Sequence, residues 1–506
     1  METVQPEIET YSGADVCLIL EGTYPYVMGG VSNWAHELIK MQSHLTFHIL
    51  TLMPEEAPAE IVFDIPENVI EISTIRLQQI RKGVKKLPSK EQKQLFLHLK
   101  KQLTAILEAA DGKALEQLLS SITSTSRDVG KELLMNSRDA WHVIEEMYMD
   151  SMHSNSFLDF FWSWRTLFGG LFTILLADLP PARVYHSLCT GYAGIMLARA
   201  KIEKQAAAVL TEHGIYTNER RIEITGAEWL KDSKAFNLST AVSTETRELR
   251  QFWSDMFTAY SKLCYRYCDE IITLFGENQQ LQIREGAEAS KCLVIPNGVD
   301  YERFSQIKRD HDHPPTVALI GRVVPIKDVK TFIKAVAILK KNVPDCIALI
   351  MGPTDEDPIY YEECKSLIYH NRLEEDITFT GRVKIDDYLP RVDIIALTSI
   401  SEAQPLVILE AGAAKIPTVA TNVGSCSELI YGAPDEQPAL GKGGLITKLA
   451  DPHAIAMAMS RLLNDAAFYN NCSSTIEKRV HSYYNKSQQK QAYYDVYQRL
   501  INLEKN

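Results

Sequence analysis

Two glutamates in the second half of the chain are spaced to bind a long, hydroxyl-rich ligand. Glu402 lies in the polar loop Ser399–Pro405, directly after an apolar run, and Glu410 follows in a helical stretch, with seven residues between the two. A carboxylate accepts hydrogen bonds only, so each glutamate suits a pair of vicinal hydroxyls. A sugar and a ribose fit this spacing. The alternative is two surface glutamates on an amphipathic helix, which the apolar neighbours of Glu410 disfavour.

Two cations follow an expected strand earlier in the same half. Arg322 and Lys327 come directly after Thr316–Ile320 and before a helix expected at Val329–Lys340. Cations near a helix N-terminus, at the C-terminal end of a parallel strand, are placed to bind a diphosphate. The alternative is two solvated loop cations.

A glycine-rich turn follows the first expected strand of the chain. Val16–Leu20 is succeeded by a loop with Gly29 and Gly30, and a helix follows with Ser32 as the expected N-cap. Such a junction lets backbone N–H groups approach an anion at the positive end of a helix. Adjacent glycines also serve a plain tight turn, so both interpretations stay open.

The elements that must position these residues alternate along the chain. Short apolar, β-rich runs are separated by helical stretches, the pattern of a parallel sheet covered by helices. We therefore predict an α/β protein. Its expected strands are Val16–Leu20, Thr46–Thr51, Val69–Ile72, Arg183–His186, Ala207–Thr211, Glu270–Thr273, Cys292–Ile295, Thr316–Ile320, Ile347–Met351, Ile377–Thr380, Ile394–Leu397, Thr418–Ala420 and Gly444–Ile446.

Two segments depart from this rhythm. Ser305–Pro315 is polar and ends in two prolines before a new strand, which predicts a linker. Gln78–Leu179 is mostly helical and predicts an insertion. Within it, Phe157–Leu176 is apolar but carries Asp159 and Arg165, and its uninterrupted part is shorter than the roughly 18–20 residues that span a membrane. We expect a buried helix pair there, with an interfacial helix as the alternative.

The charge and cysteine content limit the possible partners. The 506 residues carry a net charge of −12, which argues against nucleic acid as a general partner. Nine scattered cysteines indicate buried thiols in a reducing compartment. The acidic, polar start of the chain lacks the features of a signal peptide, so we expect a soluble cytoplasmic protein.

One stretch opposes the overall acidity. Residues 76–101 contain nine basic residues and one acid, Glu91. This stretch is interpreted either as a solvated helical face or as a patch for anionic lipid or an acidic partner.

Two acidic pairs offer a metal-dependent alternative. Asp310 and Asp312 lie in the expected linker beside His311 and His313, and Asp355-Glu356-Asp357 follows an expected strand. The first pair is also typical of a polar linker, and the second of an acidic turn.

Several motifs together resemble those of the retaining family-4 glycosyltransferases. EAQPLVILEAGAAKIPTVAT, from Glu402, resembles their block with two glutamates, and GRVVPIKD, from Gly321, resembles their basic loop. IPNGVD, from Ile295, resembles their hinge-proximal segment, and the glycine-rich turn resembles their GGV turn. The motifs follow the family order. LEGTYPYVMGGVSNW and LTEHGIYTNERRIE further resemble the cytoplasmic glycosyltransferases of Pel exopolysaccharide synthesis.

The resemblance implies a GT-B fold with two Rossmann-like domains that face each other across a cleft. Residues 1–306 would form the acceptor-side domain, with the helical insertion at about 78–179, joined by a C-terminal helix at 484–506. Residues 307–483 would bind the nucleotide sugar. Tyr493, Tyr494 and Tyr497 lie near one face of that helix, and we expect them to pack.

The resemblance also implies roles for the charged residues. Arg322 and Lys327 would neutralise the diphosphate leaving group. Glu410 would hold the ribose hydroxyls, and Glu402 the hydroxyls of the transferred sugar. His213 would contact the donor sugar near the reacting carbon; without the resemblance it is an ordinary strand-end histidine.

Backbone contacts complete the implied site. The loop around Gly381 and Val383 would meet the base, and backbone groups after Glu402 would meet the sugar or phosphate, from Ala403, Gln404, Pro405 and Leu406. The sequence departs from the family twice, with Ala403-Gln404-Pro405 after the first glutamate and Gly424-Ser425 in place of two glycines. The donor identity therefore cannot be copied from other members.

The implied activity is transfer of a hexose from a nucleotide sugar, UDP-linked by resemblance, to a growing exopolysaccharide. It would proceed with retention, without a metal and with no cofactor beyond the nucleotide sugar. The implied partners are the donor, a polysaccharide acceptor and inner-membrane synthase proteins, through which the protein would be peripheral at that membrane. Two alternatives stay open, a GT-B sugar-nucleotide epimerase and a non-catalytic nucleotide-sugar-binding subunit of a synthase complex.

Overall fold

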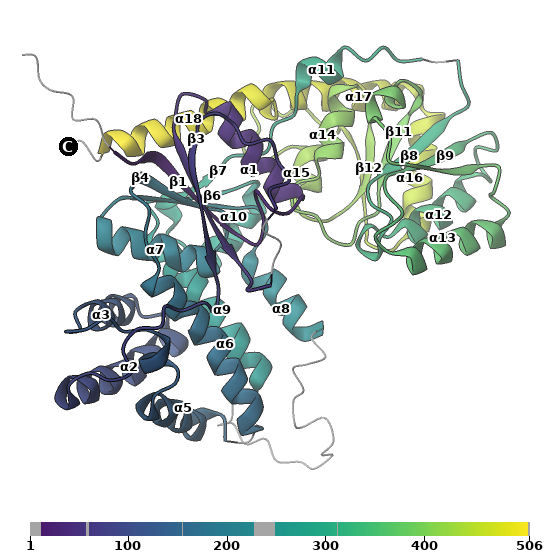
Figure 1. Cartoon of the computed structure of the whole chain (residues 1–506). Coiled ribbons are helices and arrows are strands. Elements are labelled where there is room, and N and C mark those ends of the chain that lie inside the picture. The colour runs from purple at the N-terminus through teal and green to yellow at the C-terminus, as the bar shows by residue number, and fades with distance from the viewer. Residues whose placement is uncertain (1–11, 57–59, 154, 227–247, 311, 504–506) are drawn as a thin grey trace, which may run out of the picture. The chain divides into compact units, whose positions relative to one another are not determined.

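The chain forms two compact units. The computed structural model describes residues 12–56, 60–153, 155–226, 248–310 and 312–503 (Figure 1). The first unit contains the described residues up to 273, with 279–293 and those from 494 onward, and the second contains 274–278 and 294–493. Along the chain the main passage between the units thus falls at Leu293–Val294. The segment 305–310 lies within the second unit, where Arg309 binds Leu389 and Asp393.

The first unit is built on a seven-stranded sheet with the order β3-β2-β1-β4-β5-β6-β7. The strands from β1 to β6 run parallel. β2 is buried at every position and β1 at nearly every one, which explains their almost continuous apolar sequences. The strands are β1 (Ala14–Glu21), β2 (Phe47–Met53), β3 (Val69–Arg76), β4 (Ala182–Ser187), β5 (Ala207–Glu212), β6 (Glu270–Thr273) and β7 (Cys292–Val294).

Helices connect these strands, and five of them form the insertion between β3 and β4 (Figure 1). The connecting helices are α1 (Gly30–Met41), α7 (Tyr192–Lys204), α8 (Tyr216–Gly226), α9 (Leu249–Tyr267) and α10 (Gly276–Arg284). The inserted helices are α2 (Ser89–Ala109), α3 (Gly112–Thr123), α4 (Lys131–Leu134), α5 (Arg138–Ser151) and α6 (Phe157–Leu176).

Two local expectations are wrong. Ser32 is not the N-cap of the first helix, because α1 begins at Gly30 with Gly29 at the cap position, and Ser32 is buried inside the first turn. The apolar segment 157–176 is one continuous helix, α6, and not a pair. Its glycines, Gly169 and Gly170, stay helical because the residues around them are buried against the core.

The second unit is built on a six-stranded sheet with the order β10-β9-β8-β11-β12-β13, all parallel. Its strands are β8 (Thr316–Ile320), β9 (Ile347–Met351), β10 (Ile377–Gly381), β11 (Ile394–Leu397), β12 (Thr418–Thr421) and β13 (Gly444–Thr447). Its helices are α11 (Tyr301–Ser305), α12 (Val329–Leu339), α13 (Pro358–Asn371), α14 (Leu406–Ala413), α15 (Cys426–Tyr431), α16 (Pro452–Asn464) and α17 (Ala466–Tyr483), and the chain continues into α18 (Lys486–Leu503).

The predicted fold class is confirmed. Each of the expected strands is present, and both sheets repeat the strand order 3-2-1-4-5-6 of a doubly wound, Rossmann-like domain. The helical insertion is present as well. Of the three tyrosines in α18, Tyr493 and Tyr497 are fully buried, whereas Tyr494 is 38% exposed. No helix within the described ranges is long and apolar enough to cross a membrane.

Gly424 has a conformation and a position that few other residues tolerate. Its φ is +50°, and a Cβ atom there would lie 2.1 Å from the carbonyl oxygen of Glu402. Gly441 has a φ of +98°, but no atom lies within 4 Å of its Cβ position. A substitution at Gly441 therefore introduces backbone strain alone, whereas a substitution at Gly424 introduces both backbone strain and steric overlap.

We expect Gly424→Ala to lower the melting temperature of the full chain by several degrees more than Gly441→Ala. Both variants strain the backbone, by about 1–3 kcal/mol, but only the first forces two backbone segments apart. Thermal unfolding by circular dichroism measures the difference. Equal shifts would contradict the close approach.

Candidate functional site

The point where strand order reverses in the second sheet brings together the two loops that carry the predicted charges. β8 and β11 are neighbours there, and their C-terminal loops hold Lys327 and Glu402. The Lys327 Nζ atom donates to Oε1 of Glu402 at 2.5 Å, and the Ser399 hydroxyl donates to the same oxygen at 2.6 Å. In open α/β sheets, ligands bind outside the carboxyl ends of the strands at this reversal.

Backbone contacts hold the two loops in register. The Ile400 N–H donates to the Ile326 carbonyl at 2.8 Å, and the Thr398 hydroxyl donates to the carbonyls of Lys327 and Asp328. Asp328 then caps α12 by accepting from the Thr331 N–H. Lys327 and Glu402 are therefore positioned by the sheet and not by the flexibility of their own side chains.

Arg322 lies on the same edge and lines a cavity of about 250 Å³. Its side chain is 54% exposed, and its guanidinium donates to Oε2 of Glu356 at 2.8 Å. The cavity is lined by Ile320, Gly321, Arg322, Met351, Gly352, Pro353, Arg382, Val383 and Ile385. It thus joins Arg322, predicted to meet the diphosphate, with Val383, predicted to meet the base. Gly381 lies at the end of β10, next to this lining.

Glu410 lies in α14, as predicted, whereas Glu402 lies in the preceding loop. Burial raises the pKa of the Glu410 carboxyl, an effect that the nearby Arg303 opposes and the nearby Asp386 reinforces. Arg303 and Asp386 themselves form an ion pair at 2.8 Å. The two glutamates thus sit in different surroundings, since Glu402 is already neutralised by Lys327 and Glu410 is held among apolar neighbours.

The loop between the two glutamates contains buried polar atoms. Gln404 is 7% exposed, and its Oε1 accepts from the Asn297 N–H at 2.7 Å. Its Nε2 atom is buried and has no hydrogen-bond partner among the described residues, and the same holds for the Ser425 hydroxyl. Both belong to the positions where the sequence departs from the family pattern. The Ser425 N–H donates to the Ala403 carbonyl, so the two departures are in contact.

The corresponding edge of the first sheet is filled differently. Glu21, at the end of β1, accepts from the Ala193 N–H at the start of α7 and from the Tyr216 hydroxyl. A carboxylate of the chain itself thus occupies the helix N-terminus at this strand reversal. Gly29 and Gly30 lead into α1 as predicted and are exposed, with no atom within 4 Å of their Cβ positions.

His213 follows β5 and lies in a buried aromatic and acidic cluster. Its ring packs edge-on against Trp34 at 4.7 Å, and burial lowers its pKa to about 4. The preceding residue, Glu212, accepts from the Tyr216 N–H, the Tyr265 hydroxyl and the Gln282 amide. Burial raises the Glu212 pKa to about 7, although these three hydrogen bonds oppose the rise and Glu285 adds to it.

The predicted residues therefore fall into two groups. The structure brings Lys327 and Glu402 into contact and places Arg322 and Val383 on one cavity, all within the second unit. His213, Gly29 and Gly30 belong to the first unit. Sequence reasoning missed Ser399, Gly352 and Arg382, and it named Glu356 only as part of the acidic segment after β9 and not as the partner of Arg322. Their signal was position, since each follows the end of a parallel strand by a few residues.

The acidic pairs have local partners. Asp310 accepts from Arg391 and from the Asp312 N–H, and Asp357 caps α13 through the Tyr360 N–H. His311 lies outside the described residues. Over the ranges that the structure describes, no three side chains of the histidine, cysteine, aspartate and glutamate types gather closely enough to hold a metal ion.

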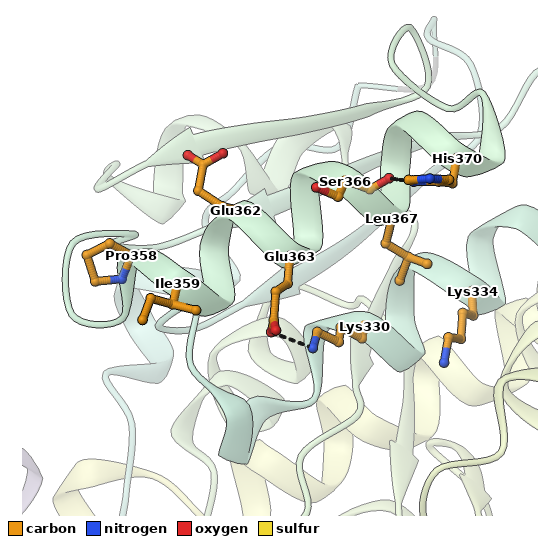
Figure 2. A pocket seen from close by; sticks show the side chains of 9 residues that line it. All are labelled: Lys330, Lys334, Pro358, Ile359, Glu362, Glu363, Ser366, Leu367 and His370. Carbon is orange, nitrogen blue, oxygen red and sulfur yellow. Dashed lines mark hydrogen bonds and ion pairs between the residues drawn. The ribbon is translucent and has the colours of Figure 1, made fainter.

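A larger groove of about 760 Å³ lies between α12 and α13 and contains none of the predicted residues. Figure 2 shows Lys330 on one wall, paired with Glu363 at 2.7 Å on the other. Its walls carry charges of both signs together with the apolar side chains of Pro358, Ile359 and Leu367.

Family models match both halves of the chain. Residues 14–290 match the family described as "Domain of unknown function (DUF3492)", and residues 314–465 match "Glycosyl transferases group 1". The second match contains Arg322, Lys327, Glu402 and Glu410.

Curated relatives are similar over part of the chain. The UDP-Gal:alpha-D-GlcNAc-diphosphoundecaprenol alpha-1,3-galactosyltransferase of Escherichia coli is 25% identical over 227 residues, which are 42% of this chain and 54% of that protein. The lipopolysaccharide core biosynthesis mannosyltransferase LpsB of Rhizobium meliloti is 25% identical over 50% of this chain and 69% of its own. The chain spans about half the length of the first of these relatives.

Solved structures share the fold over nearly the whole chain. Sucrose-phosphate synthase from Thermosynechococcus elongatus has a TM-score of 0.57 at 15% identity, covering 96% of this chain and all of its own. HepE of Anabaena, in complex with UDP, has a TM-score of 0.56 at 14% identity, covering 95% and 98%. At these identities the likeness concerns the fold alone. Because the match of residues 14–290 covers more than half of the chain, the chain belongs to the DUF3492 family. The match of residues 314–465 shows that its second domain is of the group 1 glycosyltransferase type.

Proposed function

We propose that the protein is a retaining, metal-independent glycosyltransferase that moves a hexose from a UDP-sugar to a growing exopolysaccharide of the Pel type. The observation that carries the proposal is the contact of Lys327, Glu402 and Ser399 at the strand reversal of the second sheet. This contact lies in the segment that matches the group 1 glycosyltransferases. It joins a cation suited to a phosphate with a carboxylate suited to sugar hydroxyls.

Charge development explains why such a site would accelerate transfer. Breaking the bond between the anomeric carbon and the diphosphate oxygen leaves extra negative charge on the diphosphate and a cationic sugar. Fixed cations stabilise this state more than the bound substrate, and that difference lowers the barrier. Lys327 would act from its fixed position. Arg322 would leave Glu356 to bind the diphosphate, since the exposed pair with Glu356 is worth little.

The two glutamates would orient the donor. The hydrogen bonds found for Glu402 go to Oε1, so Oε2 would accept from a hydroxyl of the transferred sugar. Glu410 would accept from the ribose hydroxyls, which would replace part of the solvation that burial removes. Val383 would pack beside the base, within the cavity that also contains Arg322.

The donor, acceptor and stereochemistry belong to the proposal. Use of UDP is supported by the UDP complex of HepE and by the UDP-galactose named for the Escherichia coli relative. A polymeric or lipid-linked acceptor is supported by the lipid-linked and lipopolysaccharide substrates in the names of the relatives. Two further parts of the proposal rest on the motif resemblance. One is retention, with the acceptor hydroxyl attacking on the leaving-group face. The other is assembly with an inner-membrane synthase.

Calorimetric titration of the full chain with a panel of UDP- and GDP-sugars tests the donor assignment. We expect one UDP-hexose to bind, and Glu410→Gln to weaken it by about tenfold, since a hydrogen bond to a charged group is lost. Glu374→Gln, an exposed change in the same unit, is the matched control.

Absence of binding by every nucleotide sugar would refute the proposal. The proposal also requires that the sugar of the bound donor is transferred to an acceptor, and that this transfer continues in the presence of EDTA. Release of an isomerised sugar nucleotide would identify an epimerase instead, and binding without turnover would identify a non-catalytic subunit.

Lys327→Ala should reduce the transfer rate by about 10²–10³-fold, as loss of one fixed charge-stabilising donor does in other enzymes. The fall should appear in kcat, because the leaving-group charge develops only in the transition state. Lys341→Ala, which removes an exposed lysine beyond α12, should leave the rate unchanged. Equal rates for the two variants would exclude Lys327 from the reaction.

Glu212 is expected to make the stability of the first unit depend on pH. Its folded pKa of about 7 exceeds the ordinary value of 4.5, so the folded chain binds this proton more tightly than the unfolded chain. The carboxyl therefore supports folding less as the pH rises from 4.5 to 7, by roughly 3 kcal/mol in total. Glu212→Gln removes this dependence, and the wild-type melting temperature, relative to that variant, should fall over this interval. Glu67→Gln, which changes an exposed carboxyl, should run parallel to wild type.

A further inference from the structure

The helical insertion exposes large apolar side chains that no described element of the first unit covers. Among the described residues, these are Leu97 (72% exposed), Trp141 (45%), Met149 (63%), Leu158 (61%) and Trp162 (59%). They lie on α2, α5 and α6, which pack against one another at one end of the unit (Figure 1). Two exposed tryptophans within one small substructure require an explanation, since single exposed apolar residues are common but clusters are not.

The apolar side chains of α6 and α5 form a continuous ridge. Leu158 and Trp162 are four residues apart and therefore lie on the same face of α6. Phe161 contacts Trp162 at 5.1 Å and Trp141 at 5.6 Å between ring centroids, so the ridge passes from one helix to the other.

Exposed lysines lie along the segment that leads into α2 and along the start of that helix. Residues 82–93 contain five of them, and none forms an ion pair with any other described residue: Lys82, Lys85, Lys86, Lys90 and Lys93. The one acid of this segment, Glu91, is engaged by the N–H and hydroxyl of Ser126. These five lysines therefore have no ion-pair partner within the described part of the insertion.

One hydrogen bond from the lysine segment, and one from the residues just before it, reach the helices that carry the apolar ridge. The Gln78 amide donates to the Thr166 carbonyl at 2.7 Å, one helical turn after Trp162. The Gln92 amide donates to Asp139 at 2.5 Å, two residues before Trp141. Two further acids of α5, Glu146 and Asp150, are bound by Lys100 of α2.

We propose that this basic–aromatic surface, made of Trp141, Leu158 and Trp162 with the lysines of residues 82–93, binds the headgroups of an anionic phospholipid bilayer. Tryptophan is enriched at membrane interfaces because its ring is apolar and its indole N–H is polar. Lysine stems lie along apolar surface while their ammonium groups reach phosphates. The contact would hold the protein at the membrane directly, whether or not it transfers sugar.

A lipid surface fits these residues better than protein partners do. A second copy of the chain would bring the same uncompensated lysines together, and like charges at an interface are repulsive. The side chains of Trp141, Leu158 and Trp162 project from helix surfaces with exposures of 45–61%. Insertion of separate projecting side chains into a headgroup layer requires no complementary shape.

Vesicle sedimentation of the full chain tests the proposal. We expect binding to vesicles of equal parts phosphatidylcholine and phosphatidylglycerol, little binding to pure phosphatidylcholine, and loss of binding as salt is raised. Lys85→Glu/Lys86→Glu should weaken binding by about tenfold or more, because it reverses two charges at the surface. Trp141→Ala/Trp162→Ala should weaken it at every salt concentration.

Matched controls come from the second unit, where Lys334→Glu/Lys341→Glu makes the same charge change and Ile359→Ala removes another exposed apolar side chain. These controls should bind as wild type does. The proposal is overturned if wild type fails to bind the anionic vesicles at low salt, or if surface variants and controls behave alike. If the surface variants lost self-association in light scattering but still bound vesicles as wild type does, the surface would be assigned to a second copy of the chain. That result would also overturn the proposal.

Discussion

The ion pair of Lys327 with Glu402 depends on one topological constraint, the reversal of strand order between β8 and β11. Adjacent parallel strands end at the same edge, but only at the reversal do the two following connections turn away to opposite faces of the sheet. The loops after β8 and β11 therefore meet above the sheet with no helix between them. The bond from Ile400 to Ile326 and those from Thr398 fix that meeting, so that Lys327 donates to a carboxylate oxygen of Glu402, 75 positions later in the sequence.

The first sheet has the same strand order, yet its reversal supports a different chemistry. Glu21 places a carboxylate on the N-terminus of α7, where an anionic ligand would otherwise bind. Bulk at Gly191 would collide with Glu21 and Tyr216, so the chain is tightly closed at this point. The carboxylate of Glu21 therefore disfavours an anion at the first strand reversal, whereas the second reversal carries the cation Lys327.

The fold was predictable because parallel strands that are buried on both faces have continuous apolar sequences. Each such strand can be recognised from its own sequence, without knowledge of its neighbours. The position of Glu402 and Glu410, on loop and helix, followed from the same reasoning. The pairing of Arg322 with Glu356 was not predictable, since it depends on how the loop after β9 passes the loop after β8. The single helix α6 was missed because tertiary packing overrides the helix-breaking tendency of Gly169 and Gly170, and no local pattern reports this packing.

The two departures from the family pattern become one feature in the structure. The Ser425 N–H binds the Ala403 carbonyl, and Gly424 packs against the Glu402 carbonyl so closely that a side chain there would displace the loop. The first glycine is therefore required by the backbone, whereas the second position tolerates a serine because its side chain points into buried space. Gln404 is fixed through Oε1 by Asn297. Its Nε2 and the Ser425 hydroxyl are buried donors with no hydrogen-bond partner among the described residues, and each such donor costs free energy. Both occur where the sequence departs from the family pattern, so this departure changes the buried polar groups of the loop and not only its backbone.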